Sequence, residues 1–354
     1  DNANGIDAGA AYVATYAPDP PPSPDVLIDP LDFDFTALGQ TVDRDGNRAI
    51  LGGDGVAVIL ERNLDDTWSV EQRLTGSAAD GFGSTAAIDG DYAVVGAPQA
   101  GGGTGTAWLY ERQAGGSWTA LPELGGVNGS IVAGDEFGTS VSISPFVSTS
   151  LSARGSIVAV GAPGTNGGEG AVYTFQRVAS GAVSPRAVSV AGDPQTGARL
   201  GEVVDIAGNR LIAAAPGADG GLGAAYVYEN PRLDSALYLQ EAKLLPGPTA
   251  SASTEFGASV AVRDAEAVVG DPGDGGGRTY VYRYGTFGAP AWATTADQEL
   301  VASDGTDGDR FGADVDLDDD LIAVGAPDVA PGQAGSMYVF SPDADGSWTE
   351  IALE

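Results

Sequence analysis

The chain of 354 residues contains no histidine and no cysteine. Without these residue types the sequence excludes Ser-His-Asp and Cys-His nucleophilic catalysis, zinc sites of the usual kind, disulfides and thiol redox chemistry. Because cysteine is missing, the redox compartment is left unassigned. Long apolar runs are missing too. None approaches the roughly 20 residues that a membrane-spanning helix needs, so we expect no direct membrane span.

Positive charge is scarce. The chain has 16 basic against 49 acidic residues and a net charge of -33, and Lys243 is its sole lysine. Such a surface repels DNA and RNA, so we expect no nucleic-acid partner. Heavy acid with arginine in place of lysine indicates a protein that works in high salt, where counterions screen charges to within ~3 Å at about 1 M. An ordinary acidic secreted protein from a GC-rich genome is the alternative.

The chain does contain a sequence motif that recurs at a nearly fixed period. An aromatic-glycine pair opens it, an apolar run follows, and a Gly-Ala-Pro-like triplet closes it. The clear openings are Phe82-Gly83, Phe137-Gly138, Phe256-Gly257 and Phe311-Gly312, with degenerate copies at Leu38-Gly39 and Leu200-Gly201. Successive openings lie 44, 55, 63, 56 and 55 residues apart. A repeat of this size cannot bury an apolar face alone, so its copies must stack on one another.

One repeat, residues 80 to 124, contains four predicted strands. They are residues 84–88, the continuous apolar run 92–96, residues 106–111 after a Gly-rich loop, and residues 117–121. Four antiparallel strands with turn signals about every ten residues predict one blade of a β-propeller. We therefore expect an all-β propeller of four-stranded blades. The aromatic of each opening should wedge between blades, and its glycine should let the backbone pass close to the next sheet.

The whole chain, residues 1–354, is expected to form a single propeller domain. Successive blade repeats are assigned to residues 36–80, 81–135, 136–198, 199–254, 255–309 and 310–354.

Ahead of these repeats, residues 1–35 match half a blade. Residues 4–13 resemble the loop and third strand, and residues 25–28 the fourth strand, whereas the inner two strands are missing. Three explanations stay open: precursor sequence supplies the pair, six blades close alone, or another chain completes the sheet by strand addition. The last would make head-to-tail contacts, which produce filaments when they do not close. We expect seven blades with one incomplete or shared.

The segment DGFGSTAAIDGDYAVVGAPQAGGGTGTAWLYER, and the recurrence of its motifs in order along the chain, resemble the FG-GAP repeat. This family is best known from the N-terminal propeller of integrin α subunits, and the present repeats are closer to the bacterial and archaeal variety with a short first turn. The resemblance implies a seven-bladed propeller, often on a cell surface, often binding calcium and used for adhesion. It does not imply an enzyme, and a fold alone never determines function.

Calcium is the one cofactor that the resemblance suggests, and the sequence departs from the integrin-type calcium loop. The first turn is usually as short as Asp89-Gly90-Asp91. Three acidic clusters are the metal candidates: Asp43, Asp45 and Asn47; Asp304, Asp307 and Asp309; Asp316, Asp318 and Asp320. Each offers three oxygen side chains where calcium takes six to eight oxygens. The first and last clusters are equally explained as the solvated face of a strand.

These features favour a non-enzymatic adhesion or assembly module, extracellular or on a cell surface, with other protein chains or surface glycans as partners and self-assembly through residues 1–35. A structural subunit of a filament or surface layer is the first alternative. A polysaccharide-cleaving enzyme, which needs two acids ~5–10 Å apart, is the second. Asn128-Gly129-Ser130 is a candidate glycosylation site that suits export, and the start at Asp1 indicates a removed signal or a fragment.

Overall fold

The computed structural model describes residues 12–13, 25–26, 38–125, 130–147, 154–178, 182–231, 237–247, 255–273, 275–285, 291–318, 320–327 and 335–351. Asn128, the candidate glycosylation site, lies outside these residues.

Each blade folds from local sequence signals, and residues 86–120 illustrate them. Strand β7 (Ala86–Asp89) turns at Gly90, whose φ of +55° suits glycine, into β8 (Tyr92–Ala97), which is buried except at its first residue. The loop that follows contains one short helical turn, α1 (Ala100–Gly103). It leads into β9 (Thr106–Arg112) and then β10 (Trp118–Ala120), and the four strands pair in consecutive order.

The other described blades repeat this antiparallel order. Their strands are β3 (Thr41–Asp45), β4 (Arg48–Gly53), β5 (Val56–Arg62) and β6 (Trp68–Thr75); β11 (Val141–Val147), β12 (Arg154–Ala162), β13 (Ala171–Val178) and β14 (Val183–Ser189); β15 (Val204–Ala207), β16 (Arg210–Ala215), β17 (Ala224–Glu229) and β18 (Leu239–Leu244); β19 (Ser259–Arg263), β20 (Glu266–Asp271), β21 (Arg278–Arg283) and β22 (Gln298–Leu300); β23 (Asp314–Leu317), β24 (Ile322–Ala326), β25 (Ser336–Pro342) and β26 (Trp348–Ile351).

Short helical turns lie in three of the loops between second and third strands: α1, α2 (Thr165–Gly168) and α3 (Ala218–Gly221). Each contains three residues with positive φ, so none is a regular helix. A 3-10 turn, η2 (Ala78–Asp80), precedes the opening pair Phe82-Gly83. The expected Gly-rich loops therefore adopt one defined shape rather than an irregular one.

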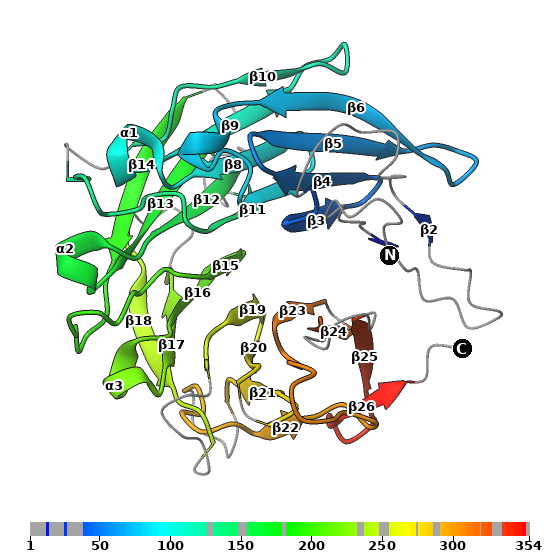
Figure 1. Cartoon of the computed structure of the whole chain (residues 1–354), viewed down its shortest axis with the longest axis vertical. Coiled ribbons are helices and arrows are strands. Elements are labelled where there is room, and N and C mark those ends of the chain that lie inside the picture. The colour runs from blue at the N-terminus through cyan, green and yellow to red at the C-terminus, as the bar shows by residue number, and fades with distance from the viewer. Residues whose placement is uncertain are drawn as a thin grey trace.

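The six four-stranded sheets stand as blades around a common centre (Figure 1). Their first strands face that centre and contact one another in chain order, from β3 through β7, β11, β15 and β19 to β23. This arrangement confirms the predicted all-β propeller. A seventh, two-stranded sheet consists of β1 (Tyr12–Val13) and β2 (Asp25–Val26), which pair antiparallel as expected for the outer half of a blade.

The apolar core is divided among the contacts between consecutive blades. One cluster, for example, joins Leu109 of β9 with Phe137 and with Tyr173 and Phe175 of β13. Another joins Val268 and Val281 of the fifth four-stranded blade with residues of the sixth. Because no blade buries its faces by itself, the stability of each blade depends on its neighbours.

Candidate functional site: the seam between the last and the first blade

A seam is the contact between one blade and the next along the chain, and the opening aromatic lies within it. Phe137 is 0% exposed and its backbone bridges to Gly105, just before the third strand of the preceding blade. Its ring packs against Tyr173 and Phe175, with ring centroids 5.5 and 6.0 Å apart. The other three opening aromatics are equally buried and pack on third-strand rings: Phe82 on Trp108, Phe256 on Tyr280, and Phe311 on Tyr338 and Phe340.

The glycine of each opening pair adopts one left-handed backbone conformation in all six repeats. The φ values lie between +89° and +93° at Gly39, Gly83, Gly138, Gly201, Gly257 and Gly312. Each of these glycines donates its N–H to the carbonyl of the first residue of its own closing triplet, with N···O distances of 2.9–3.1 Å. Side chains are strained at such φ values, so the repeat requires glycine here.

At most internal seams, the first residue of the closing triplet lies directly against the backbone of the next blade, with no room for a side chain between them. A Cβ atom on Gly96 would lie 2.2 Å from the carbonyl oxygen of Gly138, and one on Gly161 would lie 1.9 Å from that of Gly201. Gly52 and Gly270 are placed in the same way. Four of the five internal seams therefore use a glycine at this position, and Ala214 occupies it in the fourth blade.

Side chains on the innermost strands bind the backbone of the following blade. Asp43 Oδ2 accepts the N–H of Ile88 at 2.7 Å, and Asp205 Oδ2 accepts the N–H of Val262 at 2.8 Å. Ser142, at the same repeat position, accepts the N–H of Ile206 at 3.2 Å. These acceptors all lie four residues after the glycine of their opening pair, so the seam is hydrogen-bonded close to the axis.

Burial raises the proton affinity of the axial acids, and neighbouring negative charge adds to it. Burial raises the pKa of Asp43 to about 6, the backbone N–H groups of Ile88 and Arg44 oppose this, and the charges of Asp316 and Asp205 add to it. Burial likewise raises the pKa values of Asp205 and Asp316, each against backbone hydrogen bonds that lower them. The axis is thus a region of concentrated negative charge in which protons and cations are favoured.

Among the described residues, six of the chain's 16 basic residues form ion pairs with an acid of a neighbouring blade. The inter-blade ion pairs are Arg48–Asp91 at 3.6 Å, Arg112–Glu71 at 2.5 Å, Arg177–Glu111, Arg199–Glu136 at 2.9 Å, Arg263–Asp318 at 3.1 Å and Arg310–Glu255 at 2.8 Å. The arginines at 199 and 310 and the glutamates at 136 and 255 all directly precede an opening pair. This position of the repeat therefore alternates in charge over the last four of the six repeats.

The seam between the last blade (β23–β26) and the first blade (β3–β6) differs from the five internal seams. Val42, on the first blade, is 47% exposed, whereas its equivalents Ala86, Val141, Val204, Val260 and Val315 are 4–8% exposed. Met337, on the last blade, is 47% exposed, whereas its equivalents Ala57, Ala107, Val172, Ala225 and Thr279 are 0% exposed. We call the face that contains Met337 the outgoing face and the face that contains Val42 the incoming face.

Within the described residues, one carboxylate of this open seam lacks the inter-blade partner that its equivalents have. Asp316 stands where Asp43 and Asp205 stand, and its Oδ1 accepts its own neighbour's N–H, from Leu317, at 2.9 Å. Its Oδ2 has no hydrogen bond within the described part of the chain. Among the described residues, the nearest atom to a Cβ placed on Gly325 is Asp314 Cβ, at 3.6 Å. Figure 1 shows β2 beside this position, next to the first blade.

The structure places the predicted metal ligands in different settings. Asp45 Oδ2 accepts the N–H of Gly90 at 2.8 Å, and the amide of Asn47 donates to Glu61 at 3.4 Å. Asp318 pairs with Arg263, and Asp320 is exposed. The Asp43 and Asp316 clusters approach one another only through their axial acids.

The third predicted cluster stabilises a loop. Asp309 accepts both the N–H and the hydroxyl of Thr306, at 2.6 and 2.9 Å, and Asp304 accepts the hydroxyl of Tyr338 at 2.8 Å. Asp307 is exposed. Across the described residues, no three acidic side chains lie close enough together to hold a metal ion. These acids alone do not form the cage of six to eight oxygens that calcium takes, and calcium binding stays a prediction.

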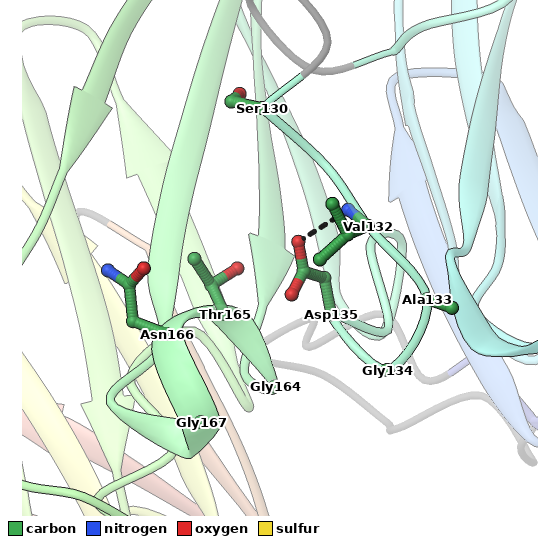
Figure 2. A pocket seen from close by; sticks show the side chains of 9 residues that line it. All are labelled: Ser130, Val132, Ala133, Gly134, Asp135, Gly164, Thr165, Asn166 and Gly167. Atoms are coloured by element: carbon green, nitrogen blue, oxygen red, sulfur yellow. Dashed lines mark hydrogen bonds between the residues drawn. The ribbon is translucent and has the colours of Figure 1, made fainter.

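One cavity of about 380 Å³ lies between the loop before Phe137 and the loop that contains α2 (Figure 2). Asp135 and Thr165 line it from facing loops and are 4% and 7% exposed. Asp135 Oδ2 accepts the N–H of Val132 at 2.8 Å, which closes the turn as Asp309 does in its own loop. The cavity thus offers one carboxylate, which already has a structural role.

Sequence reasoning placed the opening pairs but missed the axial acceptors and the exposed pair Val42 and Met337. Aligning the repeats on the opening glycine would have revealed the axial acceptors and the unusual residue at Met337, but not the exposure of Val42. The fourth residue after that glycine is Asp, Ala, Ser, Asp, Ala and Asp in turn, and the chain's single methionine falls at a position otherwise occupied by Ala, Val or Thr.

Comparison with known proteins agrees with this geometry. The family model described as FG-GAP repeat matches residues 68–110 and 294–340. No curated protein matches the sequence. A crystal structure of a protein from Lactobacillus plantarum is similar with a TM-score of 0.55 and 12% identity, over 88% of this chain and 83% of that one. At this identity the likeness supports the fold alone. Within the described residues no helix is long and apolar enough to cross a membrane. The recurring motifs, the six blades and the two family matches together show a β-propeller that contains FG-GAP repeats.

Proposed function

We propose that this propeller is a non-enzymatic binding module that works outside the cell or on its surface and attaches to other protein chains or surface glycans. The observation that supports this function best is the open seam. Met337 on its outgoing face and Val42 on its incoming face are each 47% exposed, whereas their equivalents in the other seams are buried. Exposed apolar surface at a position that is buried elsewhere in the same molecule is typical of an interaction site.

A non-catalytic role is supported by the residues available. Histidine and cysteine are missing from the sequence, and the cavity beside Asp135 offers one carboxylate where glycoside hydrolysis uses two. Asp309 and Asp304 likewise accept hydrogen bonds that hold their loop.

The charge distribution of the chain supports a role in a high-salt environment outside the cell. With a net charge of -33, the chain repels itself strongly unless counterions screen it. Six of its cations pair across seams, where Arg112 and Arg177, for example, bind acids of the preceding blade.

A bead assay in high salt tests the proposal. Beads coated with the purified chain should adhere to envelopes of the producing cells or to one another, and soluble chain should compete. Beads coated with a Met337→Glu variant should adhere less, whereas Val188→Glu, at an exposed valine on β14 of the third four-stranded blade, should adhere normally. Equal adhesion by coated and uncoated beads would contradict a binding role.

A structural subunit of a filament or surface layer is the second candidate, and the same seam favours it. The outgoing and incoming faces are different surfaces, so contact between the outgoing face of one copy and the incoming face of another is head-to-tail. Such contacts propagate when they do not close into a ring. Electron microscopy of the concentrated protein in high salt separates the two candidates, since the subunit forms ordered fibres or lattices and the adhesion module stays dispersed.

A further inference from the structure

The outgoing face of the last blade repeats three key residues of the outgoing face of the first blade. Asp316 corresponds to Asp43, Asp318 to Asp45 and Gly325 to Gly52, each at the same offset from its opening glycine or in its closing triplet. On the first blade, this set of residues receives the inner strand pair of the second blade, residues 81–98.

The contacts of that reference seam define what the face recognises. Asp43 accepts the N–H of Ile88 at 2.7 Å, and Asp45 accepts the N–H of Gly90 at 2.8 Å. The carbonyl of Gly83 lies where a side chain on Gly52 would stand, at 2.1 Å from its Cβ position. Phe82, 2% exposed, packs in one cluster with Ala57 and Ile59 of β5. The partner is therefore an aromatic-glycine hairpin with backbone N–H groups at two alternate positions.

The other borders of the open seam fit the same occupant. The incoming face of the first blade offers Val42, whose equivalents each contact a preceding blade. Strand β1, through Tyr12 and Val13, pairs with β2 on one edge, whereas third strands of the six complete blades are flanked by a second and a fourth strand. Among the described residues, no first or second strand of a blade pairs with β1 at this position.

From these correspondences we infer that the open seam is a docking site for a two-stranded β-hairpin of the aromatic-glycine repeat type, supplied in trans by another polypeptide. The hairpin donates a backbone N–H to Asp316 Oδ2, places its glycine carbonyl over Gly325, and covers Met337. This inference rests on the proposed function, because it names the partner of the proposed binding module. It is an instance of recognition by strand addition, in which backbone pairing gives affinity and side-chain pockets give specificity.

The chain itself provides both the probe and the reporter. A synthetic peptide of residues 81–98 has the required sequence, and Met337 is the only methionine in the protein. In protein labelled with ¹³C at the methionine methyl group, Met337 gives a single NMR signal. Addition of the peptide in high salt should shift this signal saturably, with one peptide bound per chain, and should slow peroxide oxidation of Met337 measured by mass spectrometry.

Matched variants distinguish specific docking of the hairpin from non-specific binding. The Phe82→Ala peptide should bind at least about tenfold more weakly, in line with the loss of a buried aromatic anchor. Asp316→Ala in the protein should weaken binding, whereas Asp316→Asn, which keeps an acceptor oxygen, should retain it. Val188→Glu, remote from the seam, should bind like the original chain. Thermal unfolding of the free variants shows that each is folded.

Other outcomes overturn the inference. If the protein unfolds cooperatively and yet the Met337 signal shows no saturable change at any peptide concentration, the open seam does not bind the hairpin. A signal that shifts with protein concentration alone assigns the face to a second copy, and contacts from Met337 to Tyr12 in the free protein assign it to β1–β2. If beads adhere while the peptide fails to bind, the proposed function stands and the hairpin inference falls. Peptide binding without bead adhesion gives the reverse result.

Discussion

In this propeller the structural role of a residue depends on the blade that packs against it. Phe137 is buried because it packs against residues of the preceding blade. Gly96 must be glycine because the backbone carbonyl of Gly138, in the following blade, lies against it. The sequence predicted the burial of the opening aromatics, because a period of about fifty residues requires stacking. It did not predict which positions of the last repeat stay exposed, since that depends on the neighbour and not on the residue itself.

Replacing Phe137 with alanine should lower the free energy of unfolding by about 3–5 kcal/mol, because the ring is 0% exposed and fills a seam. Chemical denaturation in high salt measures the change. Leu239→Ala, at a leucine that is 49% exposed, is the control and should change stability by about 0.5 kcal/mol or less. A Phe137 variant as stable as the control would show that the ring does not hold the seam.

The closing-triplet glycines allow the same substitution to be compared in two settings. Gly96→Ala should destabilise the protein by about 1–3 kcal/mol, because its Cβ would lie 2.2 Å from the oxygen of Gly138. Gly325→Ala should be neutral or stabilise by about 0.4–1 kcal/mol, because nothing lies within 3.6 Å and alanine restricts the unfolded chain. Equal effects on the melting temperature would contradict a closed seam at one position and an open seam at the other.

At the scale of strands, the blades are joined at both their inner and outer edges. The order of strands within a blade follows from local turns and apolar runs and was predictable. The links between the outer strands were not, because they use side chains with no distinctive spacing. Gln72 of β6 makes two hydrogen bonds to the backbone of Trp118 on β10, at 2.7 and 2.8 Å. Gln298 of β22 makes the same pair with Trp348 of β26.

Replacing Gln72 with alanine should therefore cost about 1–3 kcal/mol, since two backbone groups of Trp118 lose their partners. Hydrogen exchange should show faster exchange at the amide of Trp118 and unchanged exchange at the amide of Trp348, which Gln298 still binds. Equal acceleration at both tryptophans would mean that the two links are not independent, and no acceleration would mean that Gln72 does not protect the β10 edge.

At the scale of the molecule, the excess of acid was evident from composition, but its arrangement required the fold. The axial carboxylates come from repeats far apart in the chain, and Asp43, Asp205 and Asp316 share one environment only because the ring brings first strands together. The opening in that ring is likewise a property of the whole. The half repeat at residues 1–35 indicated an incomplete blade, and the exposed Val42 and Met337 identify the two faces that border it.

The raised pKa of Asp43 predicts how stability depends on pH. The folded protein binds this proton more tightly than the unfolded chain, with a pKa of about 6 against the ordinary 3.8. Proton binding at Asp43 therefore contributes to the free energy of unfolding at low pH. This contribution, about 1–3 kcal/mol, is lost as pH rises from 3.8 to about 6. Melting temperature in high salt should fall over this range. Asp43→Asn, which can still accept the N–H of Ile88, should flatten the decline.

The control for this pH effect is Asp65, an exposed acid whose pKa is lowered by hydrogen bonds from Thr67. Asp65→Asn should leave the decline between pH 4 and 6 in place, because a lowered pKa contributes in the opposite direction. An Asp43→Asn variant with the same pH profile as the original chain would contradict proton uptake at the axis.

The central claim is that five seams are closed and one is open. Because the chain has no cysteine, single-cysteine variants report on each seam without background. Thiol labelling of the folded protein should be fast at Met337→Cys and slower by on the order of 100-fold at Val172→Cys and Thr279→Cys, which occupy the same repeat position under a following blade. Equally slow labelling at all three positions would show that the seam is closed, and equally fast labelling would show that the blades do not stack.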